Sequence, residues 1–323
     1  MNIDGIILVN KPRGVSPADC NRKVQKAFDT KRVSGMDLLE NRAEGVLPIF
    51  TGKATKILRL FKGRDREYLC EVTLGYSTTT EDISGAVVEQ KEIKRKPGVK
   101  RTKDILATML GEHTQIAPMY SAVSYEGKKL HKYREEGIEI PLEKRPARHI
   151  EVLDIALKSE IIRTEADLVT FDVYVKCTEG TFIRSLMAEI GQKLGYPAHL
   201  SRLKRLSVGT FDIEAAADYE TFDMRLNILA SGGKGGLSFS NKKDQNWFIP
   251  YERVIAPFEH IKLDEELEQK ARKGKKIPSE MFGFKKEKTE PFIVTSSSGE
   301  LLAIYRFNEE FGDYRTLGVL DVE

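Results

Sequence analysis

Apolar residues recur along the chain with two different periods, one typical of helices and one typical of strands, and these predict where helices and strands lie. Cys20, Val24 and Phe28 recur every four residues, the spacing of a helix with one buried face. Ser16 stands just before this series with Pro17 in the first turn, and an acid follows three residues after the serine. The pattern predicts a helix that begins directly after Ser16.

Two later segments alternate apolar and polar residues, as strands with one buried face do. The first runs from Tyr68 to Leu74 and the second from Phe171 to Cys177. Helical spacing returns between residues 181 and 194, and Gly195 is a typical helix end. Because strands and helices mix without a regular βαβ alternation, the sequence predicts an α+β fold with a largely antiparallel sheet.

A glycine-rich polar stretch interrupts the last third of the chain. Residues 231–246 have the composition of a flexible linker or a long exposed loop. Beyond it, apolar runs at 291–295 and 301–307 flank a serine- and glycine-containing turn, which indicates a hairpin, and 315–322 reads as a further strand. We therefore expect a main domain over residues 1–230, a linker over 231–246 and a small β-rich module over 247–323.

Composition narrows the class of protein. The 323 residues carry a formal net charge of only +3, too small to indicate a nucleic-acid partner by itself. Cys20, Cys70 and Cys177 are scattered, which predicts reduced thiols in a cytoplasmic protein, and neither the cysteines nor the histidines show metal-ligand spacing. That spacing leads us to expect no metal. Because there is no long apolar run and the start lacks signal-peptide features, we also expect no membrane span.

Several short motifs follow one another in a fixed order. They are Gly5 to Gly14 with its Lys11-Pro12-Arg13-Gly14 turn; Gly45 to Ile49 and then Gly52-Lys53-Ala54-Thr55-Lys56; Leu74-Gly75 with Thr78, Thr80, Asp82 and Gly85; Gln115 to Val123 and then Gly127-Lys128-Lys129; Gly180-Thr181-Phe182-Ile183-Arg184; and Leu203-Lys204-Arg205-Leu206. The set resembles the motifs of the TruB-type bacterial tRNA pseudouridine synthases. A single match would be weak, but the ordered series is specific.

The resemblance implies a pseudouridine-synthase fold, that is, a mixed and mostly antiparallel sheet flanked by helices, with a PUA-like module at the C-terminal end. It also implies isomerisation of a uridine in the T-arm of tRNA, in which the N1–C1′ bond breaks and C5 bonds to C1′. This chemistry needs no cofactor. The implied partner is tRNA, no obligate protein partner is indicated, and a monomer is expected.

The position of the family's nucleophilic aspartate holds Glu40. In the register without a gap, the spacing from Lys23-Val24 to Gly45 equals that of the family. Asp37 fills the catalytic position only if a deletion precedes it and a compensating insertion follows, so Glu40 is favoured. The carboxylate is expected to act as a nucleophile or to assist elimination.

The resemblance assigns roles to three more residues. Tyr68 would stack on the extruded base and serve near C5, Arg184 would pair with the carboxylate and keep it charged, and Leu200 would belong to the apolar lining. Taken alone, Tyr68 reads as an ordinary half-buried aromatic and Arg184 as a surface or ion-pair arginine. Their place inside matching motifs favours the functional interpretation.

Basic residues within the motifs are candidates for contact with RNA phosphates. These are Lys53, Lys56, Lys128, Lys129 and Arg205. Since most surface lysines are simply solvated, phosphate contact and solvation both stay open. The same two interpretations stay open for the basic run at residues 91–103.

Two functions therefore compete. The first is an active tRNA pseudouridine synthase that uses Glu40, which the presence of Tyr68 and of the Gly180–Arg184 motif favours. The second is a protein on the same scaffold that binds tRNA, or helps it to fold, without modifying it, which the altered catalytic loop favours. An unrelated enzyme has little support, because no phosphate-binding glycine loop or hydrolase motif is present.

Overall fold

The computed structural model describes residues 3–36, 39–61, 63–231, 246–284 and 287–320. Contacts divide the chain into two units. Unit 1 comprises Met1–Asn41, Val46–Lys62 and Ile213–Glu323, and unit 2 comprises Arg42–Gly45 and Gly63–Asp212. The division into residues 1–230, 231–246 and 247–323 stays a prediction, and most of the expected linker lies outside the described residues, as does Asp37.

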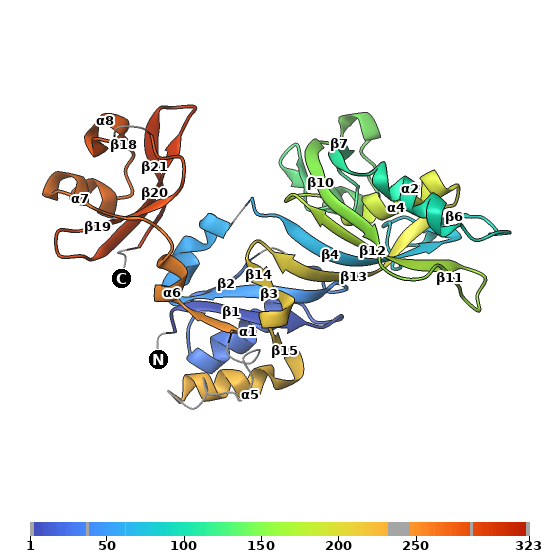
Figure 1. Cartoon of the computed structure of the whole chain (residues 1–323), viewed down its shortest axis with the longest axis horizontal. Helices are drawn as coiled ribbons and strands as arrows, with labels where there is room; N and C mark the ends of the chain where they lie inside the picture. Colours follow the sequence, from blue (N-terminus) through green and yellow to red (C-terminus); the bar gives the residue numbers. More distant parts are fainter. Residues whose placement is uncertain (1–2, 37–38, 62, 232–245, 285–286, 321–323) are drawn as a thin grey trace. The chain divides into compact units, whose positions relative to one another are not determined.

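Unit 2 is built on an antiparallel sheet. Its strand order is β13 (Ala198–Val208), β4 (Arg66–Leu74), β12 (Val169–Cys177), β10 (Ala147–Leu157) and β7 (Gly111–Ile116). Helices α2 (Val99–Ala107) and α4 (Ile183–Leu194) pack on one face, where they share a single apolar core with the strands (Figure 1). The alternation predicted for β12 is confirmed, since every second residue from Val169 to Cys177 is buried.

Shorter elements complete unit 2. They are β5 (Tyr76–Thr78), β6 (Val87–Gln90), β8 (Ser124–Tyr125), β9 (Lys128–Lys129), α3 (Leu130–Glu135), η2 (Leu142–Lys144), β11 (Ile162–Arg163) and β14 (Phe211–Asp212). Between β7 and β10 the chain forms a small separate apolar cluster around Ala117, Met119, Leu130 and Ile140. The ring of Phe182 packs against this cluster, which links it to the start of α4.

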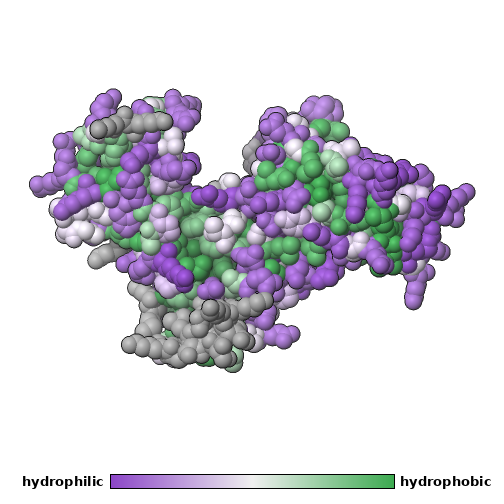
Figure 2. All heavy atoms as spheres, in the orientation of Figure 1, coloured by the Kyte–Doolittle hydropathy of each residue, from purple (hydrophilic) through white to green (hydrophobic). Residues whose placement is uncertain are grey.

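The basic run at residues 91–103 helps to hold the C-terminal end of α4. Gly195 ends this helix at a φ of 91°, as predicted. Lys91 Nζ donates to the Gly195 carbonyl at 2.8 Å and Arg101 to the Leu194 carbonyl at 3.1 Å. Cations there complement the negative end of the helix dipole. The hydrophilic surface over α2 and β6 in Figure 2 thus includes side chains that stabilise the fold.

Unit 1 contains a second group of strands. β1 (Gly5–Lys11) lies between β3 (Glu44–Thr51) and β15 (Ala217–Asp218), while β2 (Val33–Gly35) pairs with β3 and β16 (Phe248–Pro250) with β1. Helices α1 (Pro17–Phe28) and α5 (Tyr219–Ala230) pack together against this group. The remaining elements are η1 (Gly52–Phe61), η3 (Ile213–Ala215) and α6 (Tyr251–Ile255).

The predicted start of α1 is confirmed. The Ser16 hydroxyl accepts the Asp19 N–H at 3.0 Å, and the Asp19 carboxylate accepts the Ser16 N–H at 3.0 Å. This reciprocal pair satisfies two N–H groups that a helix N-terminus otherwise leaves open. Cys20, Val24 and Phe28 are all buried, as their spacing predicts.

The C-terminal part of unit 1 forms a five-stranded sheet. Its elements are β17 (His260–Lys262), α7 (Glu265–Arg272), β18 (Ile277–Pro278), α8 (Ser279–Phe282), β19 (Phe292–Thr295), β20 (Leu301–Asn308) and β21 (Asp313–Val319). The predicted hairpin is confirmed as β19 and β20, and Phe292, Tyr305 and Tyr314 pack around the Phe282 ring. Throughout the described ranges, every helix is too short or too polar to cross a membrane.

Candidate active site

Glu40 lies in unit 1, between β2 and β3 along the chain. Its side chain is exposed, whereas the preceding Leu39 is buried. The Met36 N–H donates to the Pro48 carbonyl at 2.8 Å, and the Gly14 N–H donates to the Asn41 carbonyl at 2.7 Å. These contacts hold the backbone at Met36 and at Asn41, and the Glu40 side chain next to Asn41 is exposed.

Tyr68 and Leu200 lie on the same face of the unit 2 sheet. Tyr68 of β4 pairs with Val175 of β12, and Leu200 of β13 pairs with Val72 of β4. Residues directly opposite in a sheet share a face, as do residues two and four apart on one strand. Helix α4 covers this shared face and forms one apolar core with the strands. Tyr68 is half-buried and packs against that core.

Arg184 is the second residue of α4, and its guanidinium has three fixed acceptors. Nη1 lies 3.3 Å from Asp82 Oδ2 and 3.1 Å from the Thr80 carbonyl, and Nη2 lies 2.7 Å from the Tyr120 carbonyl. The donors of a guanidinium lie in one rigid plane, so acceptors on both of its ends define its orientation. Arg184 is therefore held in place by unit 2 itself.

Asp82 is a charged partner that the sequence analysis did not single out. Burial raises the pKa of the Asp82 carboxyl, but hydrogen bonds from Ser84 and Thr80 and the Arg184 charge outweigh it, so the pKa lies below its ordinary value. The Ser84 N–H and the Thr80 hydroxyl each lie 2.8 Å from Oδ1. An aspartate that accepts the N–H two residues on forms an Asx-turn, and the Thr-x-Asp-x-Ser spacing is a signal for it.

The Asp82 loop is joined to Leu200 through the backbone. The Leu200 N–H donates to the Glu81 carbonyl at 3.0 Å, and the Leu200 carbonyl accepts the Ile83 N–H at 3.0 Å. Unit 2 thus brings Arg184, Asp82 and Leu200 together on the face that also carries Tyr68. An ionised pair beside an apolar wall and an aromatic ring suits the binding of a planar, polar base.

Comparison with known proteins decides the family. Residues 25–183 match the family model described as TruB family pseudouridylate synthase (N terminal domain). The protein named tRNA pseudouridine synthase B from Halalkalibacterium halodurans is 36% identical over 307 residues, which cover 95% of this chain and 93% of the relative. That from Bacillus subtilis (strain 168) is 35% identical over 303 residues, covering 94% and 93%. This chain belongs to the TruB family.

Solved structures support the same fold for this TruB-family chain. A chain in the crystal structure of a Cbf5–Nop10–Gar1 complex matches with a TM-score of 0.61 at 20% identity, covering 99% of this chain and 84% of that chain. A chain of an archaeal box H/ACA sRNP Nop10–Cbf5 complex matches with a TM-score of 0.61 at 15% identity, covering 98% and 86%. The predicted pseudouridine-synthase fold with a PUA-like β module is confirmed.

The lysines of this TruB-family chain that are candidates for phosphate contact lie in different surroundings. Lys53 and Lys129 are exposed. Lys56 is half-buried and donates to the Leu320 carbonyl at 2.9 Å, and its burial lowers the pKa of its ammonium group. Lys128 pairs with Glu136 and lies 4.7 Å above the Tyr133 ring. The first two are therefore the better candidates for phosphate contact.

Arg205 occupies a different place from the one expected of an RNA contact. It is 1% exposed, and the strand register sets it opposite Tyr68 on β4 and Gly45 on β3. Because a phosphate approaches from solvent, this burial does not fit the predicted contact. The structure makes Arg205 a buried neighbour of Tyr68 in the sheet.

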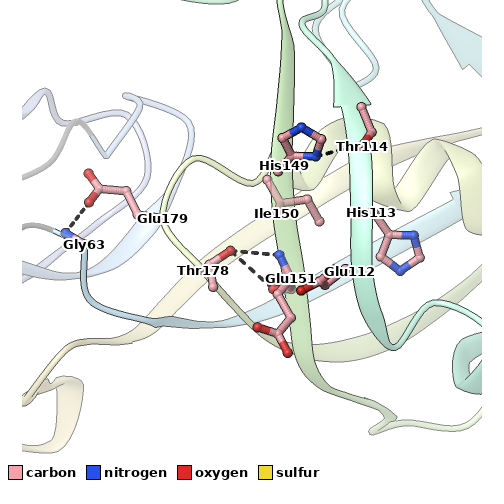
Figure 3. Close-up of a pocket in the computed structure, with 9 residues that line it drawn as sticks. All are labelled: Gly63, Glu112, His113, Thr114, His149, Ile150, Glu151, Thr178 and Glu179. Carbon is pink, nitrogen blue, oxygen red and sulfur yellow. Dashed lines mark hydrogen bonds between the residues drawn. The ribbon is translucent and has the colours of Figure 1, made fainter. Parts of the chain in front are cut away.

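A cavity of about 710 Å³ lies beside β7 and β10 (Figure 3). None of the predicted catalytic residues is in its described lining. Its described lining is Gly63, Glu112, His113, Thr114, His149, Ile150, Glu151, Thr178 and Glu179. Thr178 Oγ1 accepts the Glu151 N–H at 2.9 Å, and Glu179 pairs with Arg66 at 3.1 Å and accepts the Gly63 N–H. These bonds anchor the loop that leads into the Gly180–Arg184 motif.

Proposed function

We propose that this chain converts the T-arm uridine at position 55 of tRNA to pseudouridine. The observation that carries the proposal is the match, over nearly the full length of both chains, to relatives named tRNA pseudouridine synthase B. The ionised Asp82–Arg184 pair beside Leu200 agrees with it. Lys53 and Lys129 are the proposed phosphate contacts, and action as a monomer stays a prediction.

The reaction is an isomerisation whose atoms balance without a redox partner. The N1–C1′ bond breaks, the C5–C1′ bond forms, C5 loses a proton and N1 gains one. We assign the ionised carboxylate in this step to Glu40, which acts as a nucleophile or assists elimination of the base. Its exposed side chain, next to Asn41 whose carbonyl accepts the Gly14 N–H, supports this role.

The other residues bind the base and move its proton. The target base must leave its stack, at a cost of a few kcal/mol, and stacking on the Tyr68 ring offsets part of that cost. The Tyr68 hydroxyl then serves near C5 during the proton transfer, and Leu200 supplies an apolar wall. Arg184 stays the proposed ion-pair partner of the catalytic carboxylate, as the family resemblance implies.

The test is product formation on an unmodified tRNA transcript in a single turnover at enzyme excess. Wild type, Glu40→Gln, Glu40→Asp and Glu165→Gln are compared. Glutamine keeps the shape of glutamate but lacks the charge, so we expect product from wild type and none from Glu40→Gln. Glu165 is an exposed residue of unit 2, and its variant controls for the general effect of the same exchange.

A transcript in which cytidine replaces the T-arm uridine identifies the modified position, since it should yield no pseudouridine. Wild type that binds tRNA tightly but forms no product would overturn the proposal and support the binding protein instead. Product gained only with Glu40→Asp would support the same conclusion. Full activity of Glu40→Gln would move the catalytic role away from Glu40.

A further inference from the structure

The side-chain amide of Gln115 holds both backbone polar groups of Phe182. Gln115 Oε1 accepts the Phe182 N–H at 2.8 Å, and Nε2 donates to the Phe182 carbonyl at 3.3 Å. Gln115 lies on β7 and is 8% exposed, so these bonds are sheltered from water. Because the Gln115 amide makes both hydrogen bonds to one residue, it fixes the position and the orientation of the Phe182 backbone.

Phe182 occupies the N-cap of α4, with Arg184 as the second helical residue. Ser, Thr, Asp and Asn are usual at this position because their side chains accept a helix N–H, and a phenyl ring offers no such acceptor. In a capping box, an acid three residues on accepts the N–H of the N-cap residue. Gln115 supplies that acceptor here from a different strand.

The segment that begins at Gln115 also touches Arg184 directly. The Tyr120 carbonyl accepts the Arg184 Nη2 donor at 2.7 Å. The Phe182 ring lies 5.5 Å from the Arg148 guanidinium and packs against the small cluster of residues 117–140. The first turn of α4 is thus fixed at its backbone by Gln115 and at its ring by neighbouring side chains.

We propose that Gln115 is a positioning residue for Arg184. By fixing the N-cap of α4, it sets the Cα of Arg184 where the guanidinium reaches Asp82 and the Tyr120 carbonyl together. Loss of the clamp lets the first turn shift and moves the charge away from the reacting base. The inference rests on the proposed function, because it assigns Gln115 a part in that reaction.

The experiment compares wild type, Gln115→Met, Arg184→Lys and the double variant in single-turnover assays on unmodified tRNA. Methionine fills a similar volume but makes neither bond to Phe182. Since a shift of about 1 Å can cost on the order of 100-fold in rate, we expect Gln115→Met to slow the reaction by about 10-fold to 100-fold with tRNA affinity nearly unchanged. Gln192→Met, an exposed site on the same helix, is the matched control.

The double variant separates positioning from general stability. If Gln115 acts through Arg184, its replacement should cost little further rate once Arg184 is lysine. Equal losses in the wild-type and Arg184→Lys backgrounds, or no loss in Gln115→Met, would overturn the inference. Should Gln115→Met melt below the assay temperature, Gln115→Glu takes its place in the cycle. It keeps the acceptor for the Phe182 N–H but sets a carboxylate oxygen against the Phe182 carbonyl, so we expect a smaller loss of rate that again disappears once Arg184 is lysine.

A second readout does not depend on activity. The Nε–H resonance of Arg184, assigned by its absence in Arg184→Lys, should shift or broaden in Gln115→Met and stay in place in Gln192→Met. An unmoved resonance in Gln115→Met would overturn the inference. Wild type that forms no pseudouridine while the resonance still moves would count against the proposed function and leave the Gln115–Arg184 link standing.

Discussion

Arg184 Nη1 lies 3.3 Å from Asp82 Oδ2, although 102 residues separate the two along the chain. Asp82 is itself fixed by the Ser84 N–H and the Thr80 hydroxyl. The guanidinium is therefore oriented within unit 2 before any RNA is bound. A charge that is already in position does not have to reorganise during the reaction. Such preorganisation accounts for much of the catalytic effect of electrostatics in enzymes.

Replacing Asp82 by asparagine should destabilise the protein by about 2 to 4 kcal/mol, because it removes the charge of a buried carboxylate that Arg184, Ser84 and Thr80 all contact. The measurement is the free energy of unfolding in urea, for wild type and Asp82→Asn. Asp172→Asn, at a half-buried position on β12 of the same sheet, controls for the exchange itself.

The difference between wild type and Asp82→Asn should be constant from about pH 5 to pH 8. The folded pKa of Asp82 is lowered, so its contribution is fully present above the unfolded value of about 3.9 and is lost only as the pH falls through the folded value. A difference that changes steadily across the neutral range would show that Asp82 is not the ionised partner.

Replacing Tyr68 by phenylalanine should slow pseudouridine formation by about 100-fold or more while tRNA affinity stays nearly unchanged. The ring is kept, and the hydroxyl that we propose to serve in the proton transfer is lost. The single-turnover rate and the dissociation constant are measured together. Tyr174→Phe is the matched control, since Tyr174 lies on β12 on the opposite face of the sheet. Equal rates for Tyr68→Phe and wild type would leave Tyr68 as an ordinary half-buried aromatic.

Local signals in the sequence were sufficient for much of the fold. The Ser16 capping pattern, the alternation of β12 and the glycine after α4 all depend on neighbouring residues, and the structure confirms each of them. The start of α4 differs from its predicted place by two residues. Its N-cap is Phe182, whose backbone is held by Gln115, and a bond between residues so far apart leaves no periodic trace.

The site shows the same division between local and distant information. In the sequence, Asp82 is one residue of a motif and nothing near it indicates its partner. That partner, Arg184, follows 102 residues later along the chain. The charge of Arg205 suggests a side chain at the protein surface. In the structure Arg205 is buried on β13, which pairs with β3 and β4. A contact between a helix and a distant loop decides the first case, and register between strands decides the second. Composition and spacing along the chain encode neither of them.

Replacing Gly45 by alanine should destabilise the protein by about 2 to 4 kcal/mol. Gly45 has a φ of 115°, and an added Cβ would lie 2.1 Å from the Arg205 carbonyl oxygen and 2.6 Å from its nitrogen. Backbone atoms of a paired strand have little freedom to yield. Unfolding in urea measures the loss.

Gly127→Ala is the control for Gly45→Ala. Gly127 also has a positive φ, of 81°, but an added Cβ there meets open space among the described atoms. Backbone strain alone should cost about 1 to 2 kcal/mol at this position. If both variants lose the same stability, the close approach of β3 to β13 contributes nothing and only the positive φ matters.

The salt dependence of tRNA binding should distinguish surface cations from structural ones. Each lysine that neutralises a phosphate releases counterions, so its loss should lower the slope of log affinity against log salt by about 0.7 to 0.9. We expect this from Lys53→Gln and from Lys129→Gln, because both side chains are exposed. Filter binding between low and moderate salt measures the slope for each variant.

Two further variants give the opposite expectation. Arg205→Gln should leave the slope unchanged and lower the free energy of unfolding, because a side chain that is 1% exposed meets protein and not phosphate. Lys158→Gln should change neither quantity, since Lys158 is exposed and lies over the Tyr174 ring, on the sheet face opposite Tyr68. A lowered slope for Arg205→Gln would mean that β13 opens to admit RNA, and Arg205 would then regain the role its motif suggests.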